Sequence, residues 1–309
     1  MQVTNQTFVT EFFLLGFQNL ENFKIPFYLM LLFSYIVATS GNLLIIYLVA
    51  SNSNLRCPMY FFLTQLSISD ILMTTNIVPN TLYIVWGKGG TMSFSGCLTQ
   101  FYCLACSLAS ECLLLSIMAY DRFLAICKPL RYGTLMTTGT CINLASIMWL
   151  ISFSTELIVT ISIIQLQYCG PNVIDHFFCD SAPLLELSCS DTYFTELEIF
   201  TLGSLLTFSP LICILISYLY IVLAVLRLSA TRRRKAFSTC SSHLTVVSMF
   251  YGTLIGNYLL PIKGQSLTLS KFVSLLYTVM TPMINPIIYS LRNKDIKEAI
   301  SKHFNKVHE

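Results

Sequence analysis

Seven long apolar segments, separated by short polar stretches, dominate the pattern of side chains along the chain. They cover about residues 25–50, 58–86, 97–126, 141–164, 199–226, 244–262 and 272–291. Each reaches or exceeds the roughly 18 apolar residues that argue for a membrane-spanning helix. None alternates with a period of two, as a membrane barrel requires, and a helix satisfies its own backbone hydrogen bonds in lipid. The pattern predicts an all-α membrane protein, a seven-transmembrane helix bundle.

The two ends of the chain have a different character. Residues 1–24 are polar to mixed, without a basic start or a small-residue cleavage site, so we expect no removable signal peptide. Asn5 begins a short Asn-Gln-Thr match to the N-glycosylation pattern. In residues 292–309, Ile296, Ile300 and Phe304 recur at four-residue spacing between lysines. This spacing predicts a short cytoplasmic amphipathic helix on the inner leaflet.

Composition agrees with a membrane protein, and the charges orient it. The chain is 55% hydrophobic and 11% charged, against about 25% charged residues in soluble domains. No basic domain with interleaved aromatics is present, which argues against nucleic acid as a partner.

Of 18 basic residues, 4 (Lys24, Lys88, Lys263 and Lys271) lie on one side of the predicted membrane and 14 on the other. The positive-inside rule then predicts an extracellular N-terminus and a cytoplasmic C-terminus. The 14 are Arg56, Arg122, Lys128, Arg131, Arg227, Arg232, Arg233, Arg234, Lys235, Arg292, Lys294, Lys297, Lys302 and Lys306.

Charged residues at or inside the spans are the first candidates for function, because they are expensive in hydrocarbon. Asp121 and Arg122 end the third span, and a stop-transfer edge does not explain an acid beside an arginine there. Asp70 and Glu111 lie near mid-membrane on neighbouring helices. They form either an ion-binding site or a neutral hydrogen-bonded pair. Glu156 is expected at the interface, without an assigned role.

Several short features and long motifs occur in a characteristic order along the predicted spans. The short features are Gly41-Asn42, Leu66-Ser-Ile-Ser-Asp70, Trp149, Pro210 and Tyr218. The long motifs are Pro58-Met-Tyr-Phe-Phe-Leu63, Met118-Ala-Tyr-Asp-Arg122, Lys235-Ala-Phe-Ser-Thr-Cys-Ser-Ser-His-Leu244, Pro282-Met-Ile-Asn-Pro-Ile-Ile-Tyr-Ser-Leu-Arg-Asn293 and His176-Phe-Phe-Cys-Asp180. The short features resemble those of the rhodopsin-like G-protein-coupled receptors, and the long motifs most closely resemble the signatures of the odorant receptors of the tetrapod-type branch. The resemblance covers roughly residues 10–300.

This resemblance implies roles for particular residues. Cys97 is expected to pair with Cys179, and Cys169 with Cys189, although sequence alone leaves three connectivities open. A metal site at His176, Cys179 and Asp180 matches no standard zinc spacing, so a stapled loop is favoured over it. The resemblance also implies a sodium- and water-binding pocket at Asn42, Asp70, Glu111 and Asn285. It implies an activation switch at Asp121, Arg122, Tyr218 and Tyr289, in which Arg122 holds the third and sixth spans together in the idle receptor.

The expected ligand pocket lies in the outer half of the bundle and is almost wholly apolar, with a few hydroxyls. Such a lining suits small, weakly polar molecules, and the missing acid disfavours amines. Counting helical turns from Arg122 places Leu104, Ala105, Leu108, Ala109, Gly203, Leu206, Thr207, Tyr251, Leu254, Ile255, Tyr258, Tyr277 and Thr278 in this lining.

The function expected from this resemblance is odorant detection at the plasma membrane. The expected ligand is a small volatile molecule. The expected partners are membrane lipids and a heterotrimeric G protein of the stimulatory or olfactory type, which raises cyclic AMP. Apart from a sodium ion, no cofactor is expected. A non-olfactory chemoreceptor for a metabolite is the alternative. A transporter would show inverted repeats, and an intramembrane enzyme would place catalytic residues inside the spans. The chain shows no such repeats, and all four histidines are expected outside the spans or at their edge.

Overall fold

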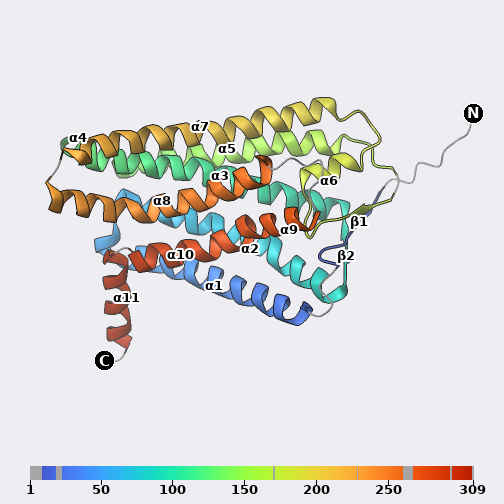
Figure 1. Cartoon of the computed structure of the whole chain (residues 1–309), viewed down its shortest axis with the longest axis horizontal. Coiled ribbons are helices and arrows are strands. Elements are labelled where there is room, and N and C mark those ends of the chain that lie inside the picture. Colours follow the sequence, from blue (N-terminus) through green and yellow to red (C-terminus); the bar gives the residue numbers. More distant parts are fainter. Residues whose placement is uncertain are drawn as a thin grey trace, which may run out of the picture.

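The structure, a computed structural model, is a bundle of long helices that run side by side (Figure 1). It describes residues 9–18, 23–169, 171–227, 229–259, 267–292 and 294–307. Six helical segments in this part of the chain are long and apolar enough to cross a membrane. They are α1 (Lys24–Ser51), α2 (Pro58–Gly87), α3 (Phe94–Cys127), α5 (Thr138–Ile164), α7 (Tyr193–Leu226) and the composite Leu269–Ser290.

The sixth of the seven expected spans is helix α8 (Ala230–Leu259), which has 30 residues. Its first turns hold the basic run from Arg232 to Lys235, so its apolar part is shorter than the helix itself. The seventh span is built from α9 (Leu267–Leu275), a π-helical turn (Leu276–Met280) and α10 (Thr281–Arg292). Pro282 lacks a backbone N–H and displaces the carbonyl one turn earlier, which explains the wider turn before it.

Short elements join the long helices. They are η1 (Ser53–Leu55), α4 (Pro129–Leu135) and α6 (Ser181–Glu186). A further helix, α11 (Lys294–Val307), follows α10 as the last element. Side-chain caps fix several of the starts: Ser93 accepts from the Gly96 amide at 3.1 Å before α3, and Thr137 accepts from the Thr140 amide at 3.2 Å before α5. Lys88, at a φ of 61°, ends α2 in the left-handed conformation.

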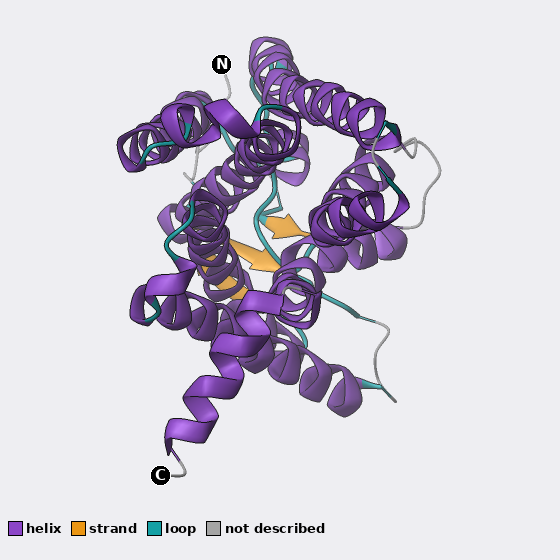
Figure 2. Cartoon of the chain, turned by 90° about the vertical axis from the view of Figure 1, so that its left-hand side faces the viewer, coloured by secondary structure: helices purple, strands orange, loops and turns teal. Residues whose placement is uncertain are grey.

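A small sheet that the apolar pattern does not predict closes one end of the bundle. It contains β1 (Glu11–Leu14), β2 (Gly90–Ser93) and β3 (Val173–Ile174), with β1 in the middle. β1 pairs antiparallel with β2 and parallel with β3, and Phe12 and Leu14 are fully buried beneath it. We call the end with this sheet the disulfide end, because the two disulfides described below lie there. The opposite end, with α4 and α11, is called the Arg122 end. Figure 2 looks along the bundle from the Arg122 end, with the strands between the helices.

The core follows the same division. A large apolar cluster fills the Arg122 half and includes Leu115, Tyr218, Phe250 and Tyr289. Two smaller clusters fill the disulfide end. Large apolar side chains such as Phe200, 71% exposed, cover the outside of the helices, as the lipid-facing surface of a membrane bundle requires.

Helix α11 turns sharply from the direction of α10 and points away from the long helices (Figure 1). Its Ile296 and Ala299 are buried in the core, and the Tyr60 hydroxyl donates to Asp295 Oδ2 at 2.7 Å. The amphipathic helix expected from the sequence is therefore present. However, Ile296 packs against protein, where the sequence analysis had placed it on the lipid leaflet, because the first turn of α11 lies against η1 and α1.

Candidate functional site

Two disulfides hold the loop between α5 and α7 over the disulfide end. Cys97 at the start of α3 pairs with Cys179, and Cys169 pairs with Cys189, with Cα–Cα distances of 5.4 and 5.9 Å. These are the pairings that the family resemblance implied. Because Cys179 is in a disulfide, it is not available to a metal ion together with His176 and Asp180. The side chain of Asp180 instead accepts from the Ser181 amide at 2.8 Å, and burial raises the pKa of its carboxyl.

A buried ion pair that the sequence analysis missed lies at the same end. Lys271, at the start of the seventh span, is only 5% exposed. Its ammonium donates to the carboxylate of Asp175 at 2.5 Å and to the carbonyl oxygen of Gly16 at 2.7 Å. The sequence analysis counted Lys271 only as one of four basic residues on the outer side of the predicted membrane. The only signal for another role was its position four residues before Leu275, on an otherwise uncharged helix.

His176 is buried beside this ion pair. Its ring packs on Phe177 and against the edge of Phe178, at centroid distances of 4.8 and 4.3 Å. Its Nδ1 has no hydrogen-bond partner among the described residues. Burial, and secondarily the nearby ammonium of Lys271, lowers the pKa of His176 to about 3. The imidazole is therefore neutral while this end of the molecule is closed.

Most of the residues expected to line the ligand pocket are buried between the helices. On α3, Leu104 and Ala109 are 3% and 5% exposed. Across the bundle, the Tyr251 hydroxyl of α8 reaches the Thr207 carbonyl of α7 at 3.5 Å. The other buried members are Leu206, Leu254, Tyr277 and Thr278, and Ala105 and Leu108 are partly buried.

Two of the expected pocket residues, Gly203 and Ile255, do not share this placement. Gly203 is exposed, and a Cβ atom added there would meet nothing within 4 Å. Ile255 is 41% exposed. Their exposure does not support the inward positions that were expected from counting helical turns, because α7 and α8 turn these positions to the side of the bundle. The side chain of Tyr258 lies outside the described residues, as does Asn5.

The acidic pair expected at mid-membrane is assembled by four helices. Asn285 of α10 donates to both carboxylate oxygens of Asp70, at 3.1 and 3.2 Å. Asn42 of α1 donates to the carbonyl of Pro282 at 3.1 Å. Glu111 of α3 is 1% exposed, and neither of its carboxylate oxygens has a hydrogen-bond partner among the described residues. Such unpaired buried oxygens are what a cation or a proton would satisfy.

At the other end, Arg122 turns back on its neighbour. Its Nη2 donates to Asp121 Oδ2 at 2.9 Å, and the Tyr132 hydroxyl of α4 donates to Asp121 Oδ1 at 2.8 Å. Arg122 and Asp121 are 12% and 1% exposed at their side chains. The Asp121–Arg122 ion pair is thus shielded from solvent near the end of α3, and Tyr132 of α4 fixes the position of the Asp121 carboxylate.

Beside this pair, a histidine that the sequence analysis placed at the edge of a span lies in the core. His243 of α8 is 2% exposed. Its Nε2 is 3.1 Å from the Leu115 carbonyl, which can only accept, so Nε2 carries the proton. Nδ1 then accepts from the Tyr218 hydroxyl at 2.8 Å. His243 thereby joins α3, α7 and α8. The signal in the sequence was its spacing of seven residues from the buried Phe250.

Tyr289, expected near the same switch, is fully buried, and its hydroxyl has no hydrogen-bond partner in the described part of the chain. Together with Tyr218 it belongs to the apolar cluster of the Arg122 half. An unpaired buried hydroxyl carries a desolvation penalty that a hydrogen bond would relieve.

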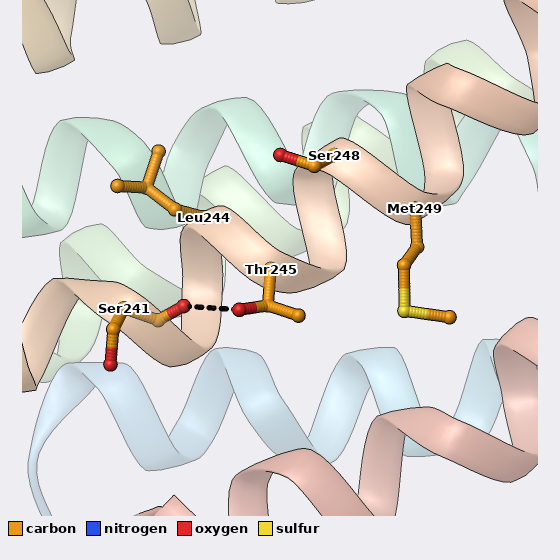
Figure 3. A pocket seen from close by; sticks show the side chains of 5 residues that line it. All are labelled: Ser241, Leu244, Thr245, Ser248 and Met249. Atoms are coloured by element: carbon orange, nitrogen blue, oxygen red, sulfur yellow. Dashed lines mark hydrogen bonds between the residues drawn. The ribbon is translucent and has the colours of Figure 1, made fainter.

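A hollow of about 510 Å³ lies along α8, away from the expected ligand pocket. Among the described residues its lining comes from that helix, at the spacing of one helix face: Ser241, Leu244, Thr245, Ser248 and Met249 (Figure 3). The Thr245 hydroxyl donates to the Ser241 carbonyl at 2.7 Å, so it is satisfied within its own helix. This is a groove on one helix, without the converging polar groups of a ligand site.

Comparisons with known proteins agree in one family. A family model described as olfactory receptor matches residues 31–307. Olfactory receptor 8U3 of Mus musculus is 44% identical over 310 residues, covering 100% of this chain and 97% of the relative. Olfactory receptor 8U8 of Homo sapiens is 44% identical over 299 residues, covering 96% and 94%. In fold, the chain is similar to the crystal structure of squid rhodopsin, with a TM-score of 0.65, 19% identity, and coverage of 92% and 87%.

Proposed function

Because the chain belongs to the olfactory receptor family, we propose that it detects small, mostly apolar volatile molecules inside the disulfide-end half of its bundle. It is an odorant receptor of the G-protein-coupled class, a multi-pass membrane protein and not an enzyme. The proposed ligand site rests on one observation: Leu104 of α3 and Tyr277 of the seventh span share one buried apolar cluster with the disulfide-bonded loop. Leu108 of α3 packs against this cluster and also against the neighbouring cluster that contains Tyr251 and Leu254 of α8. Tyr251, Thr207 and Thr278 add the few polar groups that orient a small ligand.

The ligand site is tested by filling it. Ala109→Leu adds three carbon atoms at a position that is 5% exposed, so responses to the larger members of an odorant panel should fall while the receptor still reaches the cell surface. Gly203→Leu is the matched control, because it adds bulk where nothing lies within 4 Å. An unchanged odorant profile in Ala109→Leu, or an equal change in the control, contradicts the proposed site.

We orient the receptor with its N-terminus outside the cell and place it in the plasma membrane. The support is the charge distribution: 14 of the 18 lysines and arginines lie on the side that would face the cytoplasm. Epitope tags at Met1 and Glu309 test the orientation. Antibody should label the first tag in intact cells, and the second only after permeabilisation; the reverse pattern would refute it.

We further propose that the G protein is of the stimulatory type and that the Arg122 end activates it. The shielded Asp121–Arg122 pair supports this role, because a change at α4 or α8 would release the guanidinium towards a partner. Tyr218 and Tyr289 lie in the neighbouring core and would rearrange with it. Arg122→Ala should reach the surface but fail to raise cyclic AMP. In cells that lack the stimulatory α subunit, the unaltered receptor should be silent until that subunit is restored.

Sodium is proposed as the ligand of the mid-membrane acids. The carboxylate oxygens of Glu111 have no hydrogen-bond partner among the described residues, and they lie close to Asp70 and Asn42. Asp70 in turn accepts from the amide of Asn285. Together these side chains form an oxygen-rich site that suits a hard cation. Replacing choline chloride by sodium chloride should raise the thermal stability of the purified receptor, because a ligand that binds only the folded state stabilises it. Asp70→Asn should remove the effect. No sodium effect in the unaltered receptor would favour the neutral hydrogen-bonded pair instead.

A further inference from the structure

Three segments that are far apart in the sequence meet at one ammonium group at the disulfide end. Lys271 belongs to the seventh span, Asp175 to the loop between α5 and α7, and Gly16 to the N-terminal segment. The side chain of Lys271 is 7% exposed, whereas that of Asp175 is 38% exposed. The ammonium is therefore inside the molecule, and the carboxylate covers it on the side facing water. We call these contacts the Lys271 clamp.

The N-terminal segment and the loop are already one unit without Lys271. The Leu15 amide donates to the Ile174 carbonyl at 2.9 Å, and the Gly16 amide donates to the His176 carbonyl at 3.0 Å. These bonds continue the parallel pairing of β1 with β3. The clamp attaches this unit to the seventh span, with the Phe17 and Phe272 rings in contact beside it at 5.6 Å.

The expected ligand pocket lies directly beneath the clamp. Phe177 and Phe178 of the loop are fully buried and share one apolar cluster with Leu104 of α3 and Tyr277 of the seventh span. Both of the latter are pocket residues in the proposed function. A ligand that arrives through the disulfide end must therefore pass the unit that Lys271 holds.

We propose that Lys271 gates access to this pocket: while its ammonium is bound to Asp175 and Gly16 the disulfide end is closed, and release of the clamp admits the ligand. A buried hydrogen-bonded charge pair is expensive to open, because the ammonium must find other partners or water. The frequency of opening then sets how fast ligands enter and leave, as for other locally opening segments. This inference rests on the ligand site of the proposed function.

The test measures access without any ligand or G protein, so its failure is separate from failure of the proposed function. Leu104→Cys places a thiol beneath the loop, at a position that is 3% exposed. In lipid nanodiscs, its rate of modification by cationic and anionic methanethiosulfonate reagents is followed by mass spectrometry. The unaltered chain gives the background from its native cysteines, Cys103 and Cys106 among them. Using reagents of both charges separates opening from simple attraction.

Adding Lys271→Met or Asp175→Asn to Leu104→Cys should raise both rates on the order of tenfold, and Lys271→Arg should raise them less. The matched control is Lys24→Met, since Lys24 lies at the same end but donates to the Trp86 carbonyl between α1 and α2. If Lys271→Met does not fold, Asp175→Asn decides, because its side chain is more exposed. Unchanged rates in the folded clamp variants, or an equal rise in Lys24→Met, would overturn the proposal.

Discussion

The contact between His243 and Tyr218 allows a quantitative test of how the core holds α3, α7 and α8 together. Replacing His243 by Leu keeps roughly the same volume but removes both hydrogen bonds of the ring. The Leu115 carbonyl retains its place in the backbone bonding of α3, so the main consequence is that the buried Tyr218 hydroxyl loses its imidazole acceptor and keeps only the weak contact with the Cys240 thiol. An unsatisfied buried group costs about 1–3 kcal/mol.

The converse change, Tyr218→Phe, leaves Nδ1 of His243 unpaired and should cost a similar amount. Removing both partners at once leaves neither group stranded, and such double removal is often nearly neutral. The double variant should therefore be destabilised by no more than either single variant, and by clearly less than the sum of the two single effects. A coupling free energy of about 1 kcal/mol or more is expected between the two positions.

The assay is the free energy of unfolding or, more simply, the apparent melting temperature of the purified receptor in one detergent. Because both single variants loosen the link between α8 and its neighbours, they should also raise signalling in the absence of odorant. Single effects that add to within about 0.5 kcal/mol in the double variant would show that the two side chains act independently, and would refute this reasoning.

Three further predictions follow from other contacts. Burial and a nearby ammonium lower the pKa of His176 from 6.5 to about 3, so the closed disulfide end is favoured above pH 6.5 and loses that stability as the pH falls towards 3. Between pH 7.5 and 5.5 the closed end should lose about 1.4 kcal/mol of stability. The measurement is hydrogen exchange in residues 11–17, which should become faster after correction for intrinsic rates. The effect should be absent in His176→Phe. Tyr60→Phe should free the first turn of α11 by removing the bond to Asp295, at a cost of about 0.5–1.5 kcal/mol; unchanged exchange protection of residues 294–300 would contradict this. Gly41→Val should lower the melting temperature, because even a Cβ atom there would lie 3.0 Å from Pro286. The misfit of a larger side chain costs about 1–3 kcal/mol. A stability equal to that of the unaltered chain would show that α1 can move aside.

The number and type of the long elements could be predicted from the sequence, because hydrocarbon leaves the backbone few alternatives. A run of about 20 apolar residues has to form a helix there, and its lipid-facing side chains need only be apolar. The same reasoning located the acids near mid-membrane. Asp70 and Glu111 were conspicuous because a charge is rare in such a run.

The sequence determined less about which side chains meet, and the tertiary structure decided the rest. Nothing in the spacing of Lys271 shows that Asp175 and Gly16 approach its ammonium, since the three residues lie on a span, in a loop and in the N-terminal segment after β1. The burial of His243 likewise depends on how α8 is rotated against α3. An apolar pattern fixes a helix but leaves its rotation almost free, because lipid and core accept the same side chains, and only packing against neighbouring helices selects one rotation.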